Sequence, residues 1–264
     1  MKLLVKILIA LAFVGVTLLG IGILNGGELY TALQDGRLVA LNSRFDSAAT
    51  HGTATVTDPD TIDILHIEIN GGSCEIEMGN ELSCSNEIDM TAEDDTVIFT
   101  VNGGGAEITL PEKMFETVRI DISGGKLEAD RLNASSCVIN MNGGAAEIDQ
   151  IWARSALIHE QLGNIEIEQL DVESDCQLVT MAGNLDIEDL YAVNVEAICK
   201  GGSMALGLPY EPVTYYCTAA VSAGSCTWDG GALENAGFGG TDAENILDLT
   251  VSAGAVDLYR AEKD

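Results

Sequence analysis

Apolar and polar residues alternate with period two through most of the chain after residue 62, and glycines punctuate the alternation. The stretch INMNGGAAEIDQI, which runs from Ile139 to Ile151, shows the pattern on both sides of a glycine pair. Period two places alternate side chains on one face of a strand. The stretch therefore predicts two short strands that are joined at a glycine corner.

Aligning the glycine pairs reveals a repeat whose corner residues we call the anchor glycines. Their spacings are 32, 21, 19, 19, 20, 19, 22 and 30 residues. The inner six spacings lie close to a repeat length that is typical of solenoid proteins. We attribute the two long spacings, one near each end, to extra loops. The anchor glycines are Gly72, Gly104, Gly125, Gly144, Gly163, Gly183, Gly202, Gly224 and Gly254.

The positions around each anchor glycine support this register. Every residue two or four positions after an anchor, and every residue five positions before it, is apolar. The column three positions before the anchor is apolar except for Glu160 and Thr180. Such registered columns predict an all-β fold, a parallel β-solenoid (β-helix) of about nine ~20-residue turns, each climbing one strand spacing. An antiparallel sandwich would show more varied turn signals, so we favour the solenoid.

The amino terminus has a different composition. Lys2 and Lys6 precede an unbroken apolar run, Ile7 to Leu24, which is long enough to cross a bilayer as a helix. No clear cleavage site follows, so we expect residues 1–26 to form one transmembrane anchor, with a cleaved signal peptide as the alternative. The positive-inside rule then predicts a single-pass protein of the cell membrane whose C-terminal domain is extracytoplasmic.

The remaining chain divides by composition into three parts. We interpret residues 27–61 as a juxtamembrane stalk or N-terminal cap, residues 62–260 as the solenoid domain, and residues 261–264 as a tail. Loose helical spacing of Leu29, Leu33 and Leu41 predicts a short helix within the stalk.

The charge balance restricts the partners. The chain has 42 acidic residues against 12 basic ones, a net charge of −30. Nucleic acids and anionic lipids would be repelled, whereas cations, basic peptides and basic proteins would be attracted. Two alternatives stay open: the acidic residues keep the surface soluble, or they reflect adaptation to salt.

Acidic residues gather three and five positions after the anchors, and in four successive turns both positions are acidic. Carboxylate oxygens suit Ca²⁺, and a row of negative charge also suits a basic partner. A solvated face without a ligand is the alternative. No compact calcium-loop motif is present, and we expect no other cofactor. We call these eight residues the acidic strip: Glu128, Asp130, Glu147, Asp149, Glu166, Glu168, Asp186 and Glu188.

Two pairs of apolar residues are predicted to face outward on the strand before the glycine. Val138 and Leu157 occupy the same position in adjacent turns, and so do Val179 and Ile198. Outward apolar residues on neighbouring turns predict a contact patch, which a loop of the protein, another molecule or self-association would cover.

The seven cysteines do not form a CxxC pair, and no histidine cluster accompanies them, so a zinc site is not favoured. Six of them fall in inward columns and are expected to act as core residues. Only Cys84 lies outside the register, and it is the thiol that we expect to be most reactive. The acids form a ladder rather than one distinct catalytic pair, so we expect no catalytic residues and no enzymatic activity.

The segments INGGSCEIEM, ISGGKLEADRL, MNGGAAEIDQI and MAGNLDIEDL follow a single predicted membrane helix. In this arrangement the chain resembles the bacterial putative-adhesin β-strand-repeat family, a DUF4097-like group of cell-envelope proteins. The resemblance covers roughly residues 62–260. It implies a β-solenoid and a cell-surface setting, and it supplies no catalytic residues.

Two functional hypotheses follow. The first is a non-enzymatic, extracytoplasmic binding or adhesion module of the bacterial envelope that contacts a cell-surface protein, a glycan or a basic peptide. The second is an envelope-stress or regulatory accessory protein that responds to cations or cationic peptides.

Overall fold

The computed structural model describes residues 59–85, 88–210, 214–233, 237–239 and 243–261, together with three short strands nearer the N-terminus. The chain divides into two compact units, residues 1–50 and 51–264. The first unit contains β1 (Thr31–Gln34) and β2 (Arg37–Ala40), which pair antiparallel. The predicted transmembrane segment lies outside the described residues.

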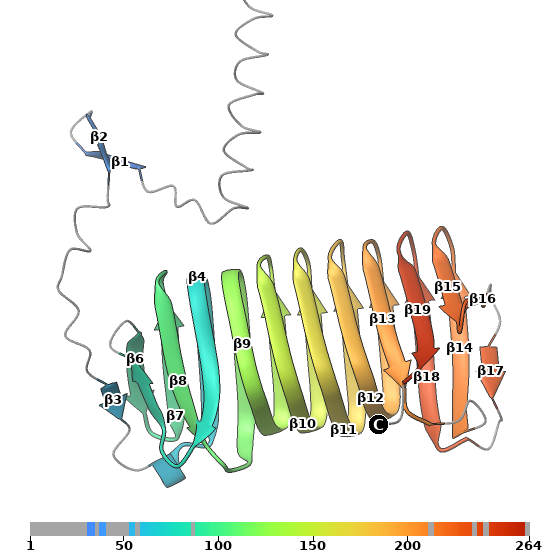
Figure 1. Ribbon diagram of the computed structural model, residues 1–264, viewed down its shortest axis with the longest axis horizontal. Coiled ribbons are helices and arrows are strands. Elements are labelled where there is room, and N and C mark those ends of the chain that lie inside the picture. The colour runs from blue at the N-terminus through green and yellow to red at the C-terminus, as the bar shows by residue number, and fades with distance from the viewer. Residues whose placement is uncertain are drawn as a thin grey trace, which may run out of the picture. The chain divides into compact units, whose positions relative to one another are not determined.

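The second unit is a stack of strands that lie side by side (Figure 1). Most of its pairings are parallel, as the registered columns predict for a solenoid. Its elements are β3 (Thr53–Thr55), the 3₁₀ turn η2 (Pro59–Thr61), β4 (Ile64–Gly79), β5 (Ser83–Ser85), β6 (Asp89–Glu93), β7 (Thr96–Val101), β8 (Gly105–Pro111), β9 (Phe115–Met141), β10 (Ala145–Glu160), β11 (Asn164–Thr180), β12 (Asn184–Cys199), β13 (Ser203–Leu208), β14 (Tyr215–Val221), β15 (Ser225–Trp228), β16 (Gly231–Ala232), β17 (Gly237–Gly239), β18 (Asn245–Val251) and β19 (Ala255–Arg260).

Each turn of the solenoid, which we call a rung, has three sides rather than the two strands that the sequence predicted. In β10 the alternation of buried and exposed residues slips by one at Asp149–Gln150 and again at Arg154–Ser155. The ladder between β10 and β11 is interrupted at both places. Two successive outward residues mark a bend in an extended chain, because strict alternation would turn the second one inward. These two bends and the glycine corner separate the three sides.

We number the sides from the anchor glycine. The first side precedes the anchor, the second side follows it as far as the bend at Asp149–Gln150, and the third side runs to the bend at Arg154–Ser155. The third side contributes its own inward column, which contains Leu132, Ile151 and Leu170 and is fully buried. Columns counted from the sequence with strict period two stop before this side.

The order of the rungs in space differs from their order in the chain at both ends. β4 pairs with β7 and β8 on one edge and with β9 on the other, although β7 and β8 follow it in sequence. Likewise β18 and β19 lie between the rung of β12 and β13 and the rung of β14 and β15 (Figure 1). The anchor glycines therefore succeed one another in the order Gly104, Gly72, Gly125, Gly144, Gly163, Gly183, Gly202, Gly254 and Gly224.

This order corrects the interpretation of the two long glycine spacings. The chain steps back by one rung between Gly72 and Gly104 and again between Gly224 and Gly254, and these are the spacings of 32 and 30 residues. The additional residues do not form loops alone. They include β5 and β6, which pair antiparallel with β8 and β7, and β16 and β17, which pair antiparallel with β15 and β14. The inserted strands thus cover the terminal rungs, whose open edges would otherwise invite pairing with another chain.

The anchor glycines are required by both conformation and space. Gly144 has a φ of 105°, which a residue with a Cβ rarely adopts. A Cβ at this position would also overlap the carbonyl oxygen of Gly125 on the neighbouring rung. The same overlap would occur between Gly125 and Gly72, which confirms that these two rungs are adjacent. The predicted corner role of the anchor is therefore confirmed at these positions.

The core is formed by the inward columns, and all seven cysteines belong to it. Burial raises the pKa of the Cys137 thiol to about 12, and burial next to Cys137 does the same for Cys176. The expectation that Cys84 is the most reactive thiol is wrong, because reagents in solution cannot reach its side chain. Cys84 is only 2% exposed, because β5 packs it against the N-terminal end of the solenoid.

The helix predicted around Leu33 is not formed, since Thr31–Gln34 and Arg37–Ala40 are paired strands. The dipeptide Asp35-Gly36 between them is a strong hairpin signal that the helical spacing obscured. Among the helices in the described part of the chain, none has the length and apolar character needed to cross a membrane.

Candidate functional site

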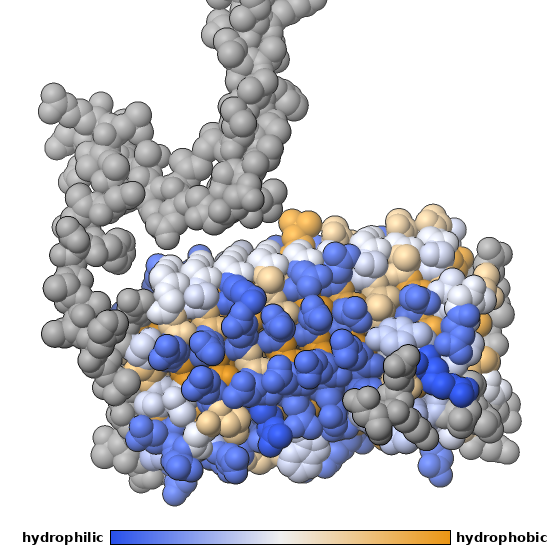
Figure 2. Space-filling view, in the orientation of Figure 1, coloured by the Kyte–Doolittle hydropathy of each residue, from blue (hydrophilic) through white to orange (hydrophobic). Residues whose placement is uncertain are grey.

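The acidic strip is exposed over its whole length, and it occupies the second side and the bend after it. Register pairs place Glu128, Glu147 and Glu166 directly beside one another on successive rungs. Asp149 stands at the bend, where the ladder is interrupted. In Figure 2, hydrophilic side chains cover most of the visible face of the solenoid, and hydrophobic residues show between them as narrow stripes.

The bend half of the acidic strip lines a groove of about 580 Å³. Four strip residues, one from each of four successive rungs, line it together with further carboxylates and a single guanidinium, that of Arg131. An open groove with mainly acidic walls concentrates cations by focusing the field of its charges. The strip residues in the groove are Asp130, Asp149, Glu168 and Glu188.

Repulsion between neighbouring carboxylates adds to desolvation in raising the pKa of two strip residues. Desolvation raises the pKa of the Glu168 carboxyl, and the charges of Asp149 and Glu188 raise it further. Desolvation also raises the pKa of Asp186, with Glu166 adding to the effect. At one end of the strip the repulsion is relieved, because the Lys126 ammonium lies between the carboxylates of Glu128 and Glu147.

The strip does not form a preformed metal centre in the described residues. No group of three or more histidine, cysteine, aspartate or glutamate side chains in this part of the chain is arranged to hold a metal ion. Ca²⁺ binding by the strip therefore stays a prediction.

The predicted apolar contact patch consists of two separate pairs on the first side. Val138 lies beside Leu157, and Val179 lies beside Ile198, as expected. All four side chains are half-buried rather than fully exposed. Val138 and Leu157 also line a shallow groove of about 590 Å³ at the start of the first side.

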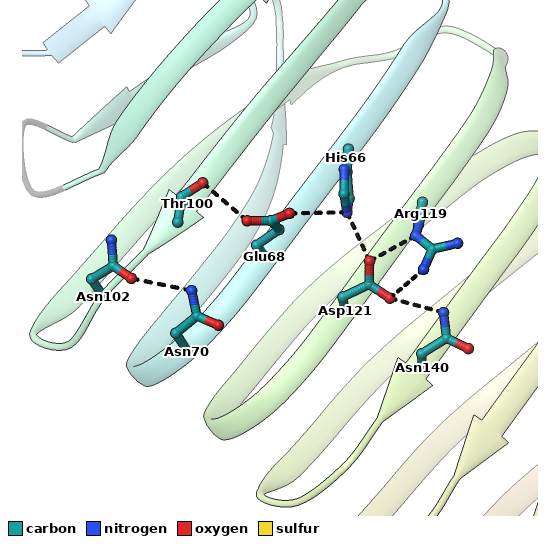
Figure 3. Close-up of polar contacts among 8 residues, drawn as sticks. All are labelled: His66, Glu68, Asn70, Thr100, Asn102, Arg119, Asp121 and Asn140. Atoms are coloured by element: carbon teal, nitrogen blue, oxygen red, sulfur yellow. Dashed lines mark hydrogen bonds and ion pairs between the residues drawn. The ribbon is translucent and has the colours of Figure 1, made fainter.

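A polar network on the first side, which the sequence analysis missed, connects the rungs at the N-terminal end (Figure 3). The Oδ2 atom of Asp121 accepts hydrogen bonds from His66 Nε2 and Arg119 Nε, both at 2.7 Å. Its Oδ1 atom accepts from Arg119 Nη2 at 2.9 Å and from Asn140 Nδ2 at 2.8 Å. Partial burial raises the pKa of Asp121, but the hydrogen bonds from Arg119, Asn140 and His66 outweigh it, and the net shift is downward.

The network extends to the terminal rung through Glu68, which lies 3.7 Å from His66 Nε2 and accepts a hydrogen bond from Thr100 at 3.4 Å. It thus crosses four rungs in spatial order, including the two whose order is reversed (Figure 3). Its residues stand four and six positions before their anchor glycines. Polar residues in these two outward columns of the first side are therefore the sequence signal by which the network could have been predicted.

A second missed cluster lies on the third side, eight positions after the anchors. Trp152 pairs in register with Asp171, which pairs in register with Tyr191. Tyr210 continues the row, and its ring centroid lies 5.7 Å from that of Tyr191 at an angle of 83°. These residues line a groove of about 300 Å³, which we call the aromatic groove. Trp152 is 44% exposed and Tyr210 is 45% exposed, although large aromatic side chains usually bury their surface.

The two polar exceptions in the core column, Glu160 and Thr180, are neighbours in adjacent rungs and fully buried. Neither carboxyl oxygen of Glu160 nor the hydroxyl of Thr180 has a hydrogen-bond partner of good geometry within the described part of the protein. Burial raises the pKa of Glu160, and the nearby Gly183 amide opposes part of this rise. The carboxyl group occupies the space that a Cβ at Gly183 would need.

The chain matches a protein family and has a distant similarity to a solved structure. No curated protein matches the sequence. A solved structure, that of a putative cell adhesion protein from Clostridium sporogenes, is similar with 13% sequence identity and a TM-score of 0.33, covering 80% of this chain and 99% of that one. The model of the Toastrack DUF4097 family matches residues 49–257. This match spans most of the chain and includes all nine anchor glycines, and the protein belongs to the Toastrack DUF4097 family.

Proposed function

We propose that this protein is a non-enzymatic binding module of adhesion type, which presents its solenoid on the outside of a bacterial cell. Membership of a family of adhesin-like β-repeat domains supports a binding role. The observation that carries the proposal is the acidic groove, whose carboxylates repeat on four successive rungs and face solvent. A rigid stack of strands holds these charges at a fixed spacing, so a partner with regularly spaced basic groups would meet them without reorganising the protein.

The proposed partner is a basic peptide or a basic segment of a cell-surface protein. Desolvation raises the pKa of Glu168, and the neighbouring carboxylates of the groove raise it further by repulsion. A cationic partner would relieve this repulsion. The chain's net charge of −30 would also speed the approach of such a partner at low ionic strength.

The test is binding of decalysine to the full chain in a non-ionic detergent, measured by calorimetry at low and high salt. We expect saturable binding that weakens as salt is raised, because the contacts are solvent-exposed charges. The variant D149N/E168Q/E188Q removes three charges from the groove and should weaken binding about tenfold or more. The matched variant E81Q/E93Q/E116Q removes three exposed charges elsewhere and should leave most of the affinity intact.

Equal losses in both variants would show that only the overall charge attracts the peptide, and the groove would lose its role. Repeating the titration with Ca²⁺ tests the cation alternative. Competition between Ca²⁺ and decalysine for the wild-type groove, absent in the groove variant, would assign both to the same carboxylates.

The membrane anchor and the outside location belong to the same proposal. The apolar run of residues 7–24 and the basic residues before it support them. We expect the chain to resist extraction from membranes by alkaline carbonate, and an epitope at the C-terminus to be reached by antibody on intact cells. A chain lacking residues 1–26 should be released from the membrane. Recovery of the intact chain in the soluble fraction would contradict the anchor.

A further inference from the structure

The aromatic groove combines aromatic faces with carboxylates on a side of the rung that the acidic strip does not use. Its lining includes Trp152, Tyr191 and Tyr210 as aromatic residues and Asp171 and Glu173 as the charged ones. No lysine or arginine lines this groove in the described part of the chain. Arg154 lies beside the groove, with its Nε 3.7 Å from Glu173, and its side chain is largely exposed.

The register sets the distances within the groove. Trp152, Asp171 and Tyr191 stand side by side on three successive rungs. Two strand spacings separate the backbones that carry the two rings, about 9.6 Å. A positive charge held over Asp171 would therefore lie between the columns of the two rings, one strand spacing from each.

The surroundings hold this arrangement in place. Asp171 Oδ2 accepts a hydrogen bond of 2.7 Å from Gln169 Nε2, which fixes the carboxylate. Tyr210 packs edge to face against Tyr191 and closes one end of the row. Burial raises the pKa of the Tyr191 phenol, and the charges of Asp189 and Asp171 add to the rise. The carboxylates in the lining make the field at the groove negative, and the raised pKa keeps the Tyr191 phenol neutral at physiological pH.

We propose that the aromatic groove binds a quaternary ammonium group, with Trp152 and Tyr191 as the ring faces and Asp171 as the counter-charge. Such a cation carries its charge on methyl groups and is weakly hydrated, so it loses little on leaving water for an aromatic wall. A metal ion such as Ca²⁺ would require more oxygen ligands than this groove offers. A lysine ammonium is compact and strongly hydrated, and it would favour the open carboxylates of the acidic strip.

The proposal is independent of the proposed function, because the acidic strip has no part in it. Two sources share the same chemistry: free choline, and the choline headgroup of a lipid. A neutral oligosaccharide is the other class of ligand that exposed aromatic residues bind. Its hydroxyls would donate hydrogen bonds to Asp171 and Glu173, but it carries no charge for them to attract, so the cation is the ligand that uses both the rings and the charge.

The test uses the full chain with Trp228→Phe, which leaves Trp152 as its single tryptophan, in a non-ionic detergent without choline groups. Choline chloride and tetramethylammonium chloride are titrated while the tryptophan emission is recorded at constant ionic strength. We expect a saturable change with both. The neutral isostere 3,3-dimethylbutan-1-ol, which has the shape of choline without its charge, should give none.

Calorimetry on variants then assigns the residues. Asp171→Asn and Trp152→Leu should each weaken choline binding about tenfold, the order expected for a partly desolvated cation–π contact and its counter-charge. Asp171→Asn preserves shape at a half-exposed position and so keeps the test independent of folding. Glu128→Gln in the acidic strip is the matched control, and it should leave choline affinity unchanged.

Vesicles of phosphatidylcholine separate the two sources. The apolar N-terminal run would insert into the vesicles in every variant, so wild type and Asp171→Asn are compared on the same vesicles. A difference between them that free choline competes away supports the site and identifies a lipid headgroup as a source, while choline binding without such a difference supports it with the free ligand. A difference between them that choline does not compete overturns the proposal. An equal response to the neutral isostere would also overturn the proposal, as would binding of cellotetraose without binding of choline.

Discussion

His66 and Asp121 are 55 residues apart in the chain, yet His66 Nε2 lies 2.7 Å from Asp121 Oδ2 on the next rung. The rung that lies between them in sequence, Thr96–Pro111, is on the opposite edge of β4. This hydrogen bond therefore exists only because the chain steps back before it goes on. The Asp121 carboxylate gathers donors from three successive rungs and links the reordered end to the regular stack.

Replacing Asp121 by Asn should lower the free energy of unfolding by about 1–2 kcal/mol at pH 7, because the amide carries no charge and keeps only one acceptor oxygen for donors that use two in a partly buried site. The native pKa of Asp121 is lowered, so its stabilisation is complete above the ordinary Asp value, near pH 4, and is lost as pH falls through the lowered native pKa. Urea denaturation between pH 7 and pH 3 measures both. Asp130→Asn, in the exposed strip, should change stability much less.

Gly144→Ala should destabilise the solenoid by about 2–4 kcal/mol. The corner requires a positive φ that alanine rarely adopts, and the added Cβ would overlap the Gly125 carbonyl oxygen. Gly124→Ala provides the matched control, since a Cβ there would meet nothing within 4 Å. Thermal and urea unfolding compare the two. Similar losses in both variants would show that the corner does not need its anchor glycine.

Glu160→Met should stabilise the protein at pH 7 by about 1–3 kcal/mol, because a buried carboxyl without good partners is replaced by the side chain of its stacked neighbour Met141. The native pKa of Glu160 is raised, so its unfavourable contribution is absent below the ordinary Glu value, near pH 4, and grows as pH rises through the raised native pKa. The gain over wild type should therefore shrink as pH falls toward 4. A gain that does not vary with pH would contradict this account, and Glu166→Gln controls for surface charge.

Glu168→Gln should raise the melting temperature slightly, because it removes one charge from a row of like charges that already raise the pKa of this carboxyl. Added sodium chloride should reduce the difference, since exposed charges are screened. Differential scanning calorimetry at low and high salt gives the comparison. Glu93→Gln, at an exposed position in β6, should show no such gain.

The seven cysteines should resist alkylation by N-ethylmaleimide in the folded chain and react together after unfolding in urea. All seven are buried, and burial raises the pKa of Cys74, Cys137, Cys176 and Cys217 to about 12. Mass spectrometry counts the modified residues. Rapid modification of Cys84 alone in the folded protein would restore its predicted role as the accessible thiol.

The sequence alone was sufficient to predict the repeat, because the signals that define a rung are local. Period two fixes which residues of β10 face inward, and the positive φ of Gly144 fixes its corner, so both can be recognised within about ten residues of chain. The exposed acidic strip followed from the same columns. The third side was missed because the alternation slips at Asp149–Gln150, and a column counted with strict period two ends there.

The order of the rungs was decided only by the tertiary structure. Every rung presents the same inward columns. The rung of Gly72 could therefore pair equally well with the rung of Gly104 or with that of Gly125, and in the folded protein it lies between the two. Which edges meet depends on strand pairings between residues far apart in the chain, and periodicity carries no information about them. The network at Asp121 and the terminal caps follow from that pairing. The aromatic groove follows from the bends that create the third side, and for this reason it could be found only after the strands had been placed in space.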